Sequence, residues 1–119
     1  MTSNAFRREF RLLTSSEFDK VFEKPIRASA QGVLVLARAN NLDSCARLGL
    51  VVPKKVLKRA VWRNRIKRLV RESFRLNHNS MPSADYVFIA RPSIDKFSNE
   101  QLYLMLKKLW EQISHRLAK

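Results

Sequence analysis

Basic side chains are concentrated in one stretch of this 119-residue chain, residues 54–75. Against a single acid, Glu72, the stretch carries ten cations: Lys54, Lys55, Lys58, Arg59, Arg63, Arg65, Lys67, Arg68, Arg71 and Arg75. Six of these cations recur at every fourth position from Lys55 to Arg75. In a helix such residues are neighbours, and each like-charge pair costs about 0.2–0.5 kcal/mol. A row that repels itself is best explained by an external polyanion, so the stretch indicates binding to phosphate groups.

Wound as a helix, this stretch has two different faces. The apolar stripe consists of Trp62, Ile66, Leu69, Val70, Ser73 and Leu76, with Phe74 at its edge. The opposite face consists of Asn64, Lys67, Arg68, Arg71 and Arg75, and the stripe is flanked by Arg63 and Arg65. We expect the stripe to cover a sheet and the basic face to meet a ligand. The alternative is a merely solvated face, but a face that needs only solubility would interleave acids among its cations.

No combination of catalytic side chains is apparent in the sequence. His78 lies in a polar loop and His115 near the C-terminus, and neither has a Ser, Cys or carboxylate at a spacing that suggests a triad. The ten acids are scattered, without a clustered pair for two-metal chemistry. The two glycines, Gly32 and Gly49, form no glycine-rich phosphate loop, and the lone Cys45 joins no zinc-ligand cluster. The sequence therefore predicts a binding protein with no catalytic or metal-ligating residue of its own.

Composition limits the class of protein. A formal net charge of +14 and a pI near 11 indicate nucleic acid or an anionic surface as the partner. With 119 residues and 45% hydrophobic residues, we expect one domain, residues 1–119, with a modest core. No apolar run approaches the roughly 18 residues of a membrane span, and arginines interrupt the N-terminus where a signal peptide needs apolar residues. We expect a cytoplasmic, reduced protein.

The N-terminal part is predicted to be a basic arm followed by a short helix. The arm covers residues 1–12 and is expected to be partly ordered. Thr14 and Glu17 have the spacing of a capping box, which predicts a helix that continues to the next proline. This helix carries Phe18 and Phe22 on one face. The two aromatic rings could belong to the core or could stack on bases.

The middle of the chain is predicted to contain the strands. The apolar runs Val33–Ala37, Arg47–Val52 and Tyr86–Ala90 are typical of buried strands. Residues 27–31 are ambiguous, with a short edge strand as one interpretation. A loop of about nine residues between the first two runs suggests an antiparallel hairpin. The basic helix is expected to begin near Val56.

A last helix follows the final strand. Ser98 and Gln101 form a second capping box. The apolar stripe of this helix consists of Leu102, Leu106, Leu109, Trp110, Ile113 and Leu117. The complete order is α-β-β-β-α-β-α, which predicts an α+β fold, a single-domain two-layer sandwich. A strand–helix–strand unit would ordinarily cross over with a right hand.

Fifteen positions of the basic stretch carry a fixed pattern of apolar, Ala, Asn and basic residues. They read Leu57-x-x-Ala60-x-x-Arg63-Asn64-Arg65-Ile66-Lys67-Arg68-x-Val70-Arg71. This pattern resembles the signature of the bacterial ribonuclease P protein subunit, which is built around an Arg-Asn-Arg motif. The similarity runs from Arg11-Leu12 through Trp110. Its other marked parts are Phe18-x-x-Val21-Phe22, Arg47-Leu48-Gly49-Leu50-Val51-Val52 with Lys54-Lys55, and Asp85-Tyr86-Val87-Phe88-Ile89-Ala90-Arg91.

The resemblance implies a fold and an activity. The strand–basic helix–strand crossover would be left-handed, as in one domain of a small-subunit ribosomal protein. The chain would be the protein subunit of an endoribonuclease ribonucleoprotein, a hydrolase that removes the 5′ leader of precursor tRNA during tRNA processing. The catalytic centre would lie on the RNA, with Mg²⁺ bound mainly by that RNA and no organic cofactor. The expected partners are the catalytic RNA and precursor tRNA, without membrane or DNA, in a complex of one protein monomer and one RNA.

The resemblance also assigns binding residues. The residues expected to contact the catalytic RNA are Lys54, Lys55, Arg59, Arg63, Asn64, Arg65, Lys67, Arg68 and Arg71. The residues expected in a leader-binding cleft between the first helix and the sheet are Arg11, Phe18, Phe22 and Val35. Val35 stands where some members of the family have an aromatic residue. Pro53 replaces a small residue often found before the lysine pair, which predicts a slightly different entry into the helix.

Other classes of protein share some of these features. A ribosomal or RNA-chaperone protein would have the same charge and no active site, but it would co-purify with ribosomes. A helix-turn-helix DNA-binding module is disfavoured because a strand and Pro53 precede the basic helix, where that motif has a helix and a short turn. A membrane-active amphipathic helix would need the apolar stripe that the sheet requires as its cover.

Overall fold

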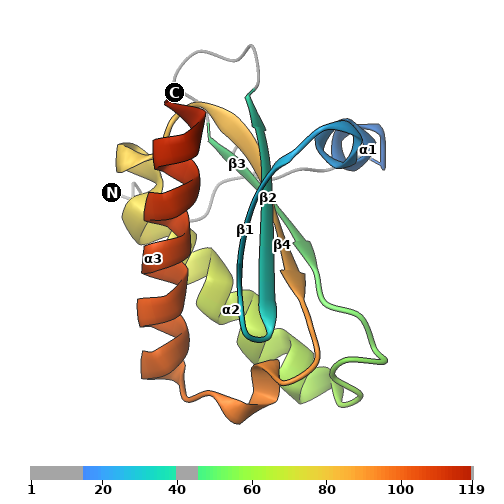
Figure 1. Ribbon diagram of the computed structural model, residues 1–119. Helices are drawn as coiled ribbons and strands as arrows, with labels where there is room; N and C mark the ends of the chain where they lie inside the picture. Colours follow the sequence, from blue (N-terminus) through green and yellow to red (C-terminus); the bar gives the residue numbers. More distant parts are fainter. Residues whose placement is uncertain (1–14, 40–45, 119) are drawn as a thin grey trace, which may run out of the picture.

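The structure is a computed structural model that describes residues 15–39 and 46–118 (Figure 1). Within these ranges the elements are α1 (Ser15–Glu23), β1 (Ile26–Ala30), β2 (Val33–Ala39), β3 (Arg47–Val51), α2 (Ala60–Asn77), β4 (Ala84–Ala90) and α3 (Asn99–Leu117). Two short 3₁₀ helices, η2 (His78–Ser80) and η3 (Ile94–Lys96), follow α2 and β4. The predicted α+β class and element order are confirmed. The expected arm, Thr14 of the first capping box and Cys45 lie outside the described residues.

The strands form one sheet in the order β1-β2-β4-β3. β2 pairs antiparallel with both β1 and β4, whereas β3 runs parallel to β4. The predicted hairpin between Val33–Ala37 and Arg47–Val52 is therefore wrong, because β4 lies between these two strands. β4 is buried on both sides along most of its length, as a central strand should be, and α2 connects it to its parallel neighbour β3. The left hand of this crossover stays a prediction from the resemblance.

Helices cover both faces of the sheet. Figure 1 shows α2 and α3 along one face, with α1 on the other side. The larger core lies under α2 and α3, where Trp110 donates from Nε1 to Ser73 Oγ at 3.0 Å and meets the Phe74 ring edge to face at 5.7 Å between centroids. On the opposite face, Val21 of α1 packs against Leu36 and Val87.

The basic helix has the predicted orientation but a later start. Its buried residues are Ile66, Leu69, Val70, Ser73 and Phe74. Trp62 and Leu76, which were expected in the same stripe, are exposed at the two ends of the helix. α2 begins at Ala60, where we expected a start near Val56, because the amides of Val56 and Leu57 both donate to the Pro53 carbonyl at 3.1 Å in a separate turn.

The start of α3 is as predicted. Ser98 Oγ accepts from the amide of Gln101 at 3.2 Å, and Gln101 Oε1 accepts from the amide of Ser98 at 2.8 Å. All members of the predicted α3 stripe face the core, although Leu117 is only partly buried. Together these contacts fix α3 beside α2 and over β1.

Candidate RNA interface

The outer side of α2 carries much of the predicted RNA-binding set. Asn64, Arg68 and Arg71 are exposed, and Lys67 is half-buried. Ile66 and Leu69, on the inner side, are buried in the core. The helix therefore holds amide and guanidinium groups toward solvent on a rigid support. Arginine forks and the asparagine amide suit the phosphates and 2′-hydroxyls of folded RNA.

The two arginines of the Arg-Asn-Arg motif make hydrogen bonds within the protein. Arg63 Nη1 donates to the carbonyls of Leu57 and Lys58, both at 2.9 Å, and so holds the turn that precedes α2. Arg65 reaches the other way, toward α3. This use was not predicted from the sequence, although the position of both residues beside the apolar stripe was a signal that they approach neighbouring elements.

Arg65 connects α2 to the start of α3. Its Nε donates to Asn99 Oδ1 at 2.8 Å and its Nη2 donates to the Phe97 carbonyl at 3.0 Å. A guanidinium has five N–H donors, so both motif arginines keep donors for a ligand. Their predicted RNA contacts stay predictions, beside a structural role that the hydrogen bonds establish.

The segment before α2 adds three of the predicted RNA-binding cations. Lys54 and Lys55 are exposed in the turn after β3, and Arg59 is exposed immediately before the helix. The guanidinium carbon of Arg59 lies 5.2 Å from the centroid of the Trp62 ring, a cation–π arrangement. These residues extend the basic surface of α2 beyond its first turn.

The last cation of the row is already compensated. Arg75 Nε donates to Glu72 Oε2 at 3.2 Å, and its Nη2 contacts Glu72 Oε1. This hydrogen bonding with Glu72 raises the pKa of Arg75. The charge of Arg75 is therefore partly neutralised within the helix before any anionic ligand binds.

Of the predicted leader-binding residues, Phe18 and Phe22 lie on α1. Phe18 is half-buried against the cluster of Val21, Leu36 and Val87, whereas Phe22 is 43% exposed. Phe18 therefore fits the interpretation of a core residue in part. Phe22 lies at the surface, where a ring could stack on a base. Arg11 lies outside the described residues.

Val35 was expected beside the aromatics of α1, and this prediction is wrong. Val35 is 0% exposed and belongs to the core under α2 and α3, on the opposite face of the sheet. Side chains alternate between the faces of a strand. Its neighbours Leu34 and Leu36 are therefore the β2 residues that face α1.

Two arginines of the sheet hold α1 in place, which the sequence did not reveal. Arg47 of β3 donates from Nε and Nη2 to the two Asp85 carboxylate oxygens at 2.8 Å, and from Nη1 to Glu17 Oε2 at 2.6 Å. The Asp85 hydrogen bonds, assisted by Glu17, raise the pKa of the Arg47 guanidinium. Arg38 Nη1 donates to the Lys20 carbonyl at 2.6 Å and to Glu23 at 2.9 Å. α1 is therefore tied to the sheet near both ends.

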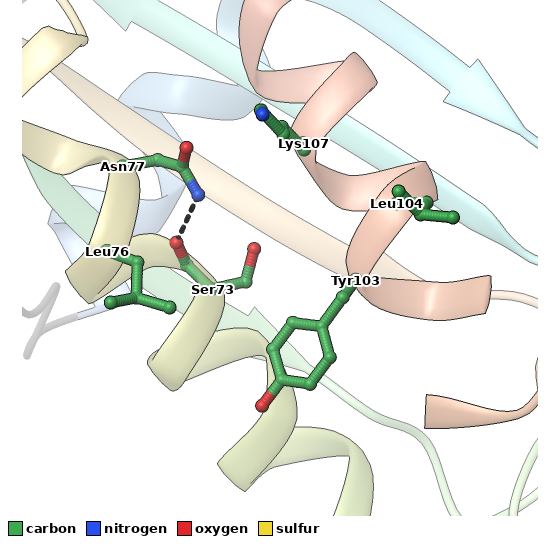
Figure 2. Close-up of a pocket in the computed structure, with 6 residues that line it drawn as sticks. All are labelled: Ser73, Leu76, Asn77, Tyr103, Leu104 and Lys107. Atoms are coloured by element: carbon green, nitrogen blue, oxygen red, sulfur yellow. Dashed lines mark hydrogen bonds between the residues drawn. The ribbon is translucent and has the colours of Figure 1, made fainter. Parts of the chain in front are cut away.

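A hollow of about 400 Å³ lies between α2 and α3 (Figure 2). Its lining is formed by Ser73, Leu76, Asn77, Tyr103, Leu104 and Lys107. Asn77 turns inward and donates to the Ser73 carbonyl at 2.7 Å. Most of the accessible lining is apolar, and Lys107 is the one cation among the described residues that line it. This hollow is therefore less basic than the outer surface of α2.

Within residues 15–39 and 46–118, no group of three or more His, Cys, Asp or Glu side chains is placed to hold a metal ion. Among the same residues, no helix has both the length and the apolarity to cross a membrane.

Comparisons with known proteins agree with this geometry. Residues 6–114 match the family model described as Ribonuclease P. The chain belongs to the ribonuclease P protein family. It is 50% identical over 114 residues to the ribonuclease P protein component of Vibrio cholerae, with 96% of each chain covered. It is 54% identical over 107 residues to that of Haemophilus influenzae, with 90% of this chain and 89% of the relative covered.

Solved structures of ribonuclease P proteins share the fold. The protein from Staphylococcus aureus superposes with a TM-score of 0.81 at 25% identity, covering 88% of this chain and 97% of that one. The protein from Thermotoga maritima gives a TM-score of 0.77 at 31% identity, covering 87% of this chain and 96% of that one. As a ribonuclease P protein component, the chain is a subunit of a tRNA-processing ribonucleoprotein.

Proposed function

We propose that this chain binds the catalytic RNA of ribonuclease P through the outer side of α2. The observation that carries this proposal is the division of α2 into a buried face at Ile66 and Leu69 and an exposed face at Asn64, Arg68 and Arg71. Removing a cation from the exposed face should therefore weaken phosphate binding without opening the core. Burial of the other face makes the helix a rigid platform, which favours binding of a folded RNA.

The surface of α1 is proposed to contact the 5′ leader of precursor tRNA. Phe22 offers an exposed ring, and Phe18 lies on the same helix with part of its surface accessible. Unpaired bases stack on such rings with about 1–3 kcal/mol each. The arginine contacts that hold α1 on the sheet keep this aromatic surface in a constant position relative to β2 and β3.

Cleavage is proposed to occur at a centre on the RNA, with Mg²⁺ as its ion. Mg²⁺ prefers oxygen ligands such as phosphate and carboxylate groups. The surface proposed to meet the RNA is cationic, which fits an ion held mainly by RNA oxygens. When bound, the ion supplies activation of the attacking water. The residues of this chain would screen RNA phosphates and so favour the folded, metal-loaded complex, as one protein on one RNA in the cytoplasm.

The test is reconstitution of the ribonucleoprotein. Rigorously RNA-free protein should leave precursor tRNA intact, whereas protein with the catalytic RNA and Mg²⁺ should raise the rate of leader removal. The increase should be largest at low salt and low Mg²⁺, where phosphate repulsion limits the RNA most. Cleavage by the protein alone that is lost on substitution of one side chain would overturn the proposal. Sedimentation of the complex should give one protein per RNA.

A further inference from the structure

Trp62 is the exposed member of the two tryptophans in the chain. The other tryptophan, Trp110, is 1% exposed, whereas Trp62 is 43% exposed on the first turn of α2. Single exposed apolar residues are common on protein surfaces. Trp62 differs from such residues because of what surrounds it in the chain and what lies on its ring.

The surroundings of Trp62 are cationic. Lys54, Lys55 and Lys58 precede it by four to eight residues and are all exposed. Arg59 lies over its ring, with 5.2 Å between the guanidinium carbon and the ring centroid. A cation on an aromatic face fixes the ring and makes it a rigid surface. Because 43% of Trp62 stays accessible, the ring can still receive a second planar group.

The charge of this region selects the partner. A second copy of the chain, at a formal net charge of +14, would repel it. A ligand that suits the region must carry both anionic groups for the lysines and a flat aromatic face for the ring. An unpaired nucleotide has both, in its phosphate and its base, and stacking accepts every base because each has a π face.

We propose that Trp62, with Arg59 stacked on it, is a binding site for one unpaired base of RNA. The flanking phosphates would contact Lys54, Lys55 and Lys58. The inference rests on the proposed function, because it adds a base-stacking position to the RNA surface of α2. It assigns to Trp62 a binding role that neither its place in the apolar stripe nor the Arg-Asn-Arg motif indicates.

Fluorescence can observe this site directly. Trp110 is buried and Trp62 is exposed, so subtracting the spectrum of Trp62→Phe from that of the unmodified protein isolates the emission of Trp62. Three RNAs are titrated separately: the catalytic RNA, precursor tRNA with its leader, and mature tRNA. Stacking should quench the isolated emission with one of them at saturation, and the RNA that does so identifies the source of the base.

Affinity gives the second readout. Trp62→Ala should weaken binding of that RNA by about 5- to 150-fold, the loss expected for one stacked base, and Trp62→Phe should restore most of it. The slope of log K against log salt should stay unchanged in Trp62→Ala, because no charge is removed. Val61→Ala and Leu104→Ala serve as controls, because Val61 and Leu104 are exposed aliphatic residues. Both variants should bind RNA with full affinity.

Several results would overturn the inference. One is full RNA affinity of a folded Trp62→Ala protein, together with no quenching of the isolated Trp62 emission when the unmodified protein binds RNA. Another is quenching by anionic lipid vesicles with none by RNA, and a third is self-association that Trp62→Ala abolishes. Arg68→Ala and Arg71→Ala distinguish failure of the stacking site from failure of the proposed function. If they weaken binding of the catalytic RNA while Trp62→Ala does not, only the stacking site is wrong. If they too leave affinity unchanged, the proposed RNA surface is wrong.

Discussion

Arg47 and Asp85 are register partners on the parallel strands β3 and β4, and their side chains form a two-pronged ion pair. Both hydrogen bonds, Nε to Oδ1 and Nη2 to Oδ2, measure 2.8 Å, and the two side chains are 17% and 10% exposed. The remaining Nη1 group of the same guanidinium reaches Glu17 on α1. The Arg47 side chain of β3 thus contacts both β4 and α1.

We expect Arg47→Ala to lower the free energy of unfolding by about 3 kcal/mol, because it leaves the Asp85 carboxylate nearly buried without its partner. Urea denaturation measures this loss. Arg38→Ala is the matched control, since its ion pair with Glu23 is 43% and 69% exposed and should contribute less than about 1 kcal/mol. Equal losses in the two variants would contradict the assignment of Arg47 as the main link.

The two faces of α2 should separate stability from RNA binding. Arg68→Ala and Arg71→Ala each remove a cation from the exposed face of α2. Arg68→Ala should leave the free energy of unfolding unchanged or slightly higher, because like-charge repulsion falls. The affinity of both variants for the catalytic RNA should drop, and the salt slope should become shallower by somewhat under one unit for each phosphate that the variant no longer neutralises. Thermal unfolding beside RNA titration at several salt concentrations checks both expectations.

Ile66→Ala and Leu69→Ala are the counterparts on the buried face. Each should lower the free energy of unfolding by roughly 2–5 kcal/mol, and RNA affinity should fall only as far as the population of folded protein falls. If Arg71→Ala unfolds the protein while a fully folded Ile66→Ala protein no longer binds RNA, the orientation of α2 is wrong.

Arg65 should behave differently from Arg68, although both belong to the basic stretch. Arg65→Ala removes the hydrogen bonds to Asn99 and the Phe97 carbonyl, and we expect a loss of about 1–2 kcal/mol in the free energy of unfolding. Arg68→Ala should show no such loss. The comparison needs only denaturation curves of the two variants, and equal stability would mean that the packing of α2 against α3 does not depend on Arg65.

Phe22→Ala should lower the affinity of the holoenzyme for precursor tRNA by about 1–3 kcal/mol and leave binding of mature tRNA unchanged. Its stability should change by less than about 1 kcal/mol, because the ring is exposed. Phe18→Ala should cost more stability, since Phe18 packs against the Val21 cluster. A Phe22→Ala protein with an unaltered preference for precursor tRNA would mean that the Phe22 ring does not contact the leader.

The parts of the fold that depend on local pattern were predictable. The Ser98–Gln101 capping box and the burial of Ile66, Leu69 and Val70 follow from spacing along one helix, and the structure confirms them. Pairing of strands depends on the whole sheet. The loop length between Val33–Ala37 and Arg47–Val52 therefore led to the wrong prediction of a hairpin. The face of the sheet on which Val35 lies depends on the strand register, because a shift by one residue moves every side chain to the opposite face.

The candidate site was predictable in its charges but not in its hydrogen bonds. The position of Arg68 and Arg71 on the outer side of α2 follows from helical periodicity. The hydrogen bonds of Arg63 and Arg65, and the ion pairs of Arg47, connect residues of different elements. Such interactions depend on tertiary packing, which no local spacing encodes. For the same reason Trp62 was assigned to the buried stripe although the core does not reach it.

The place of β4 has a consequence for how the protein is made. β4 is the last strand to leave the ribosome, yet it lies between β2 and β3. Until it emerges, β3 has no strand beside it, and the β1–β2 hairpin alone is marginally stable in water. The helix α2 is synthesised before the sheet that it covers is complete, so its cations remain on an unfolded nascent chain. Folding and assembly with RNA should therefore be post-translational, or nearly so, with no stable N-terminal intermediate to begin the ribonucleoprotein.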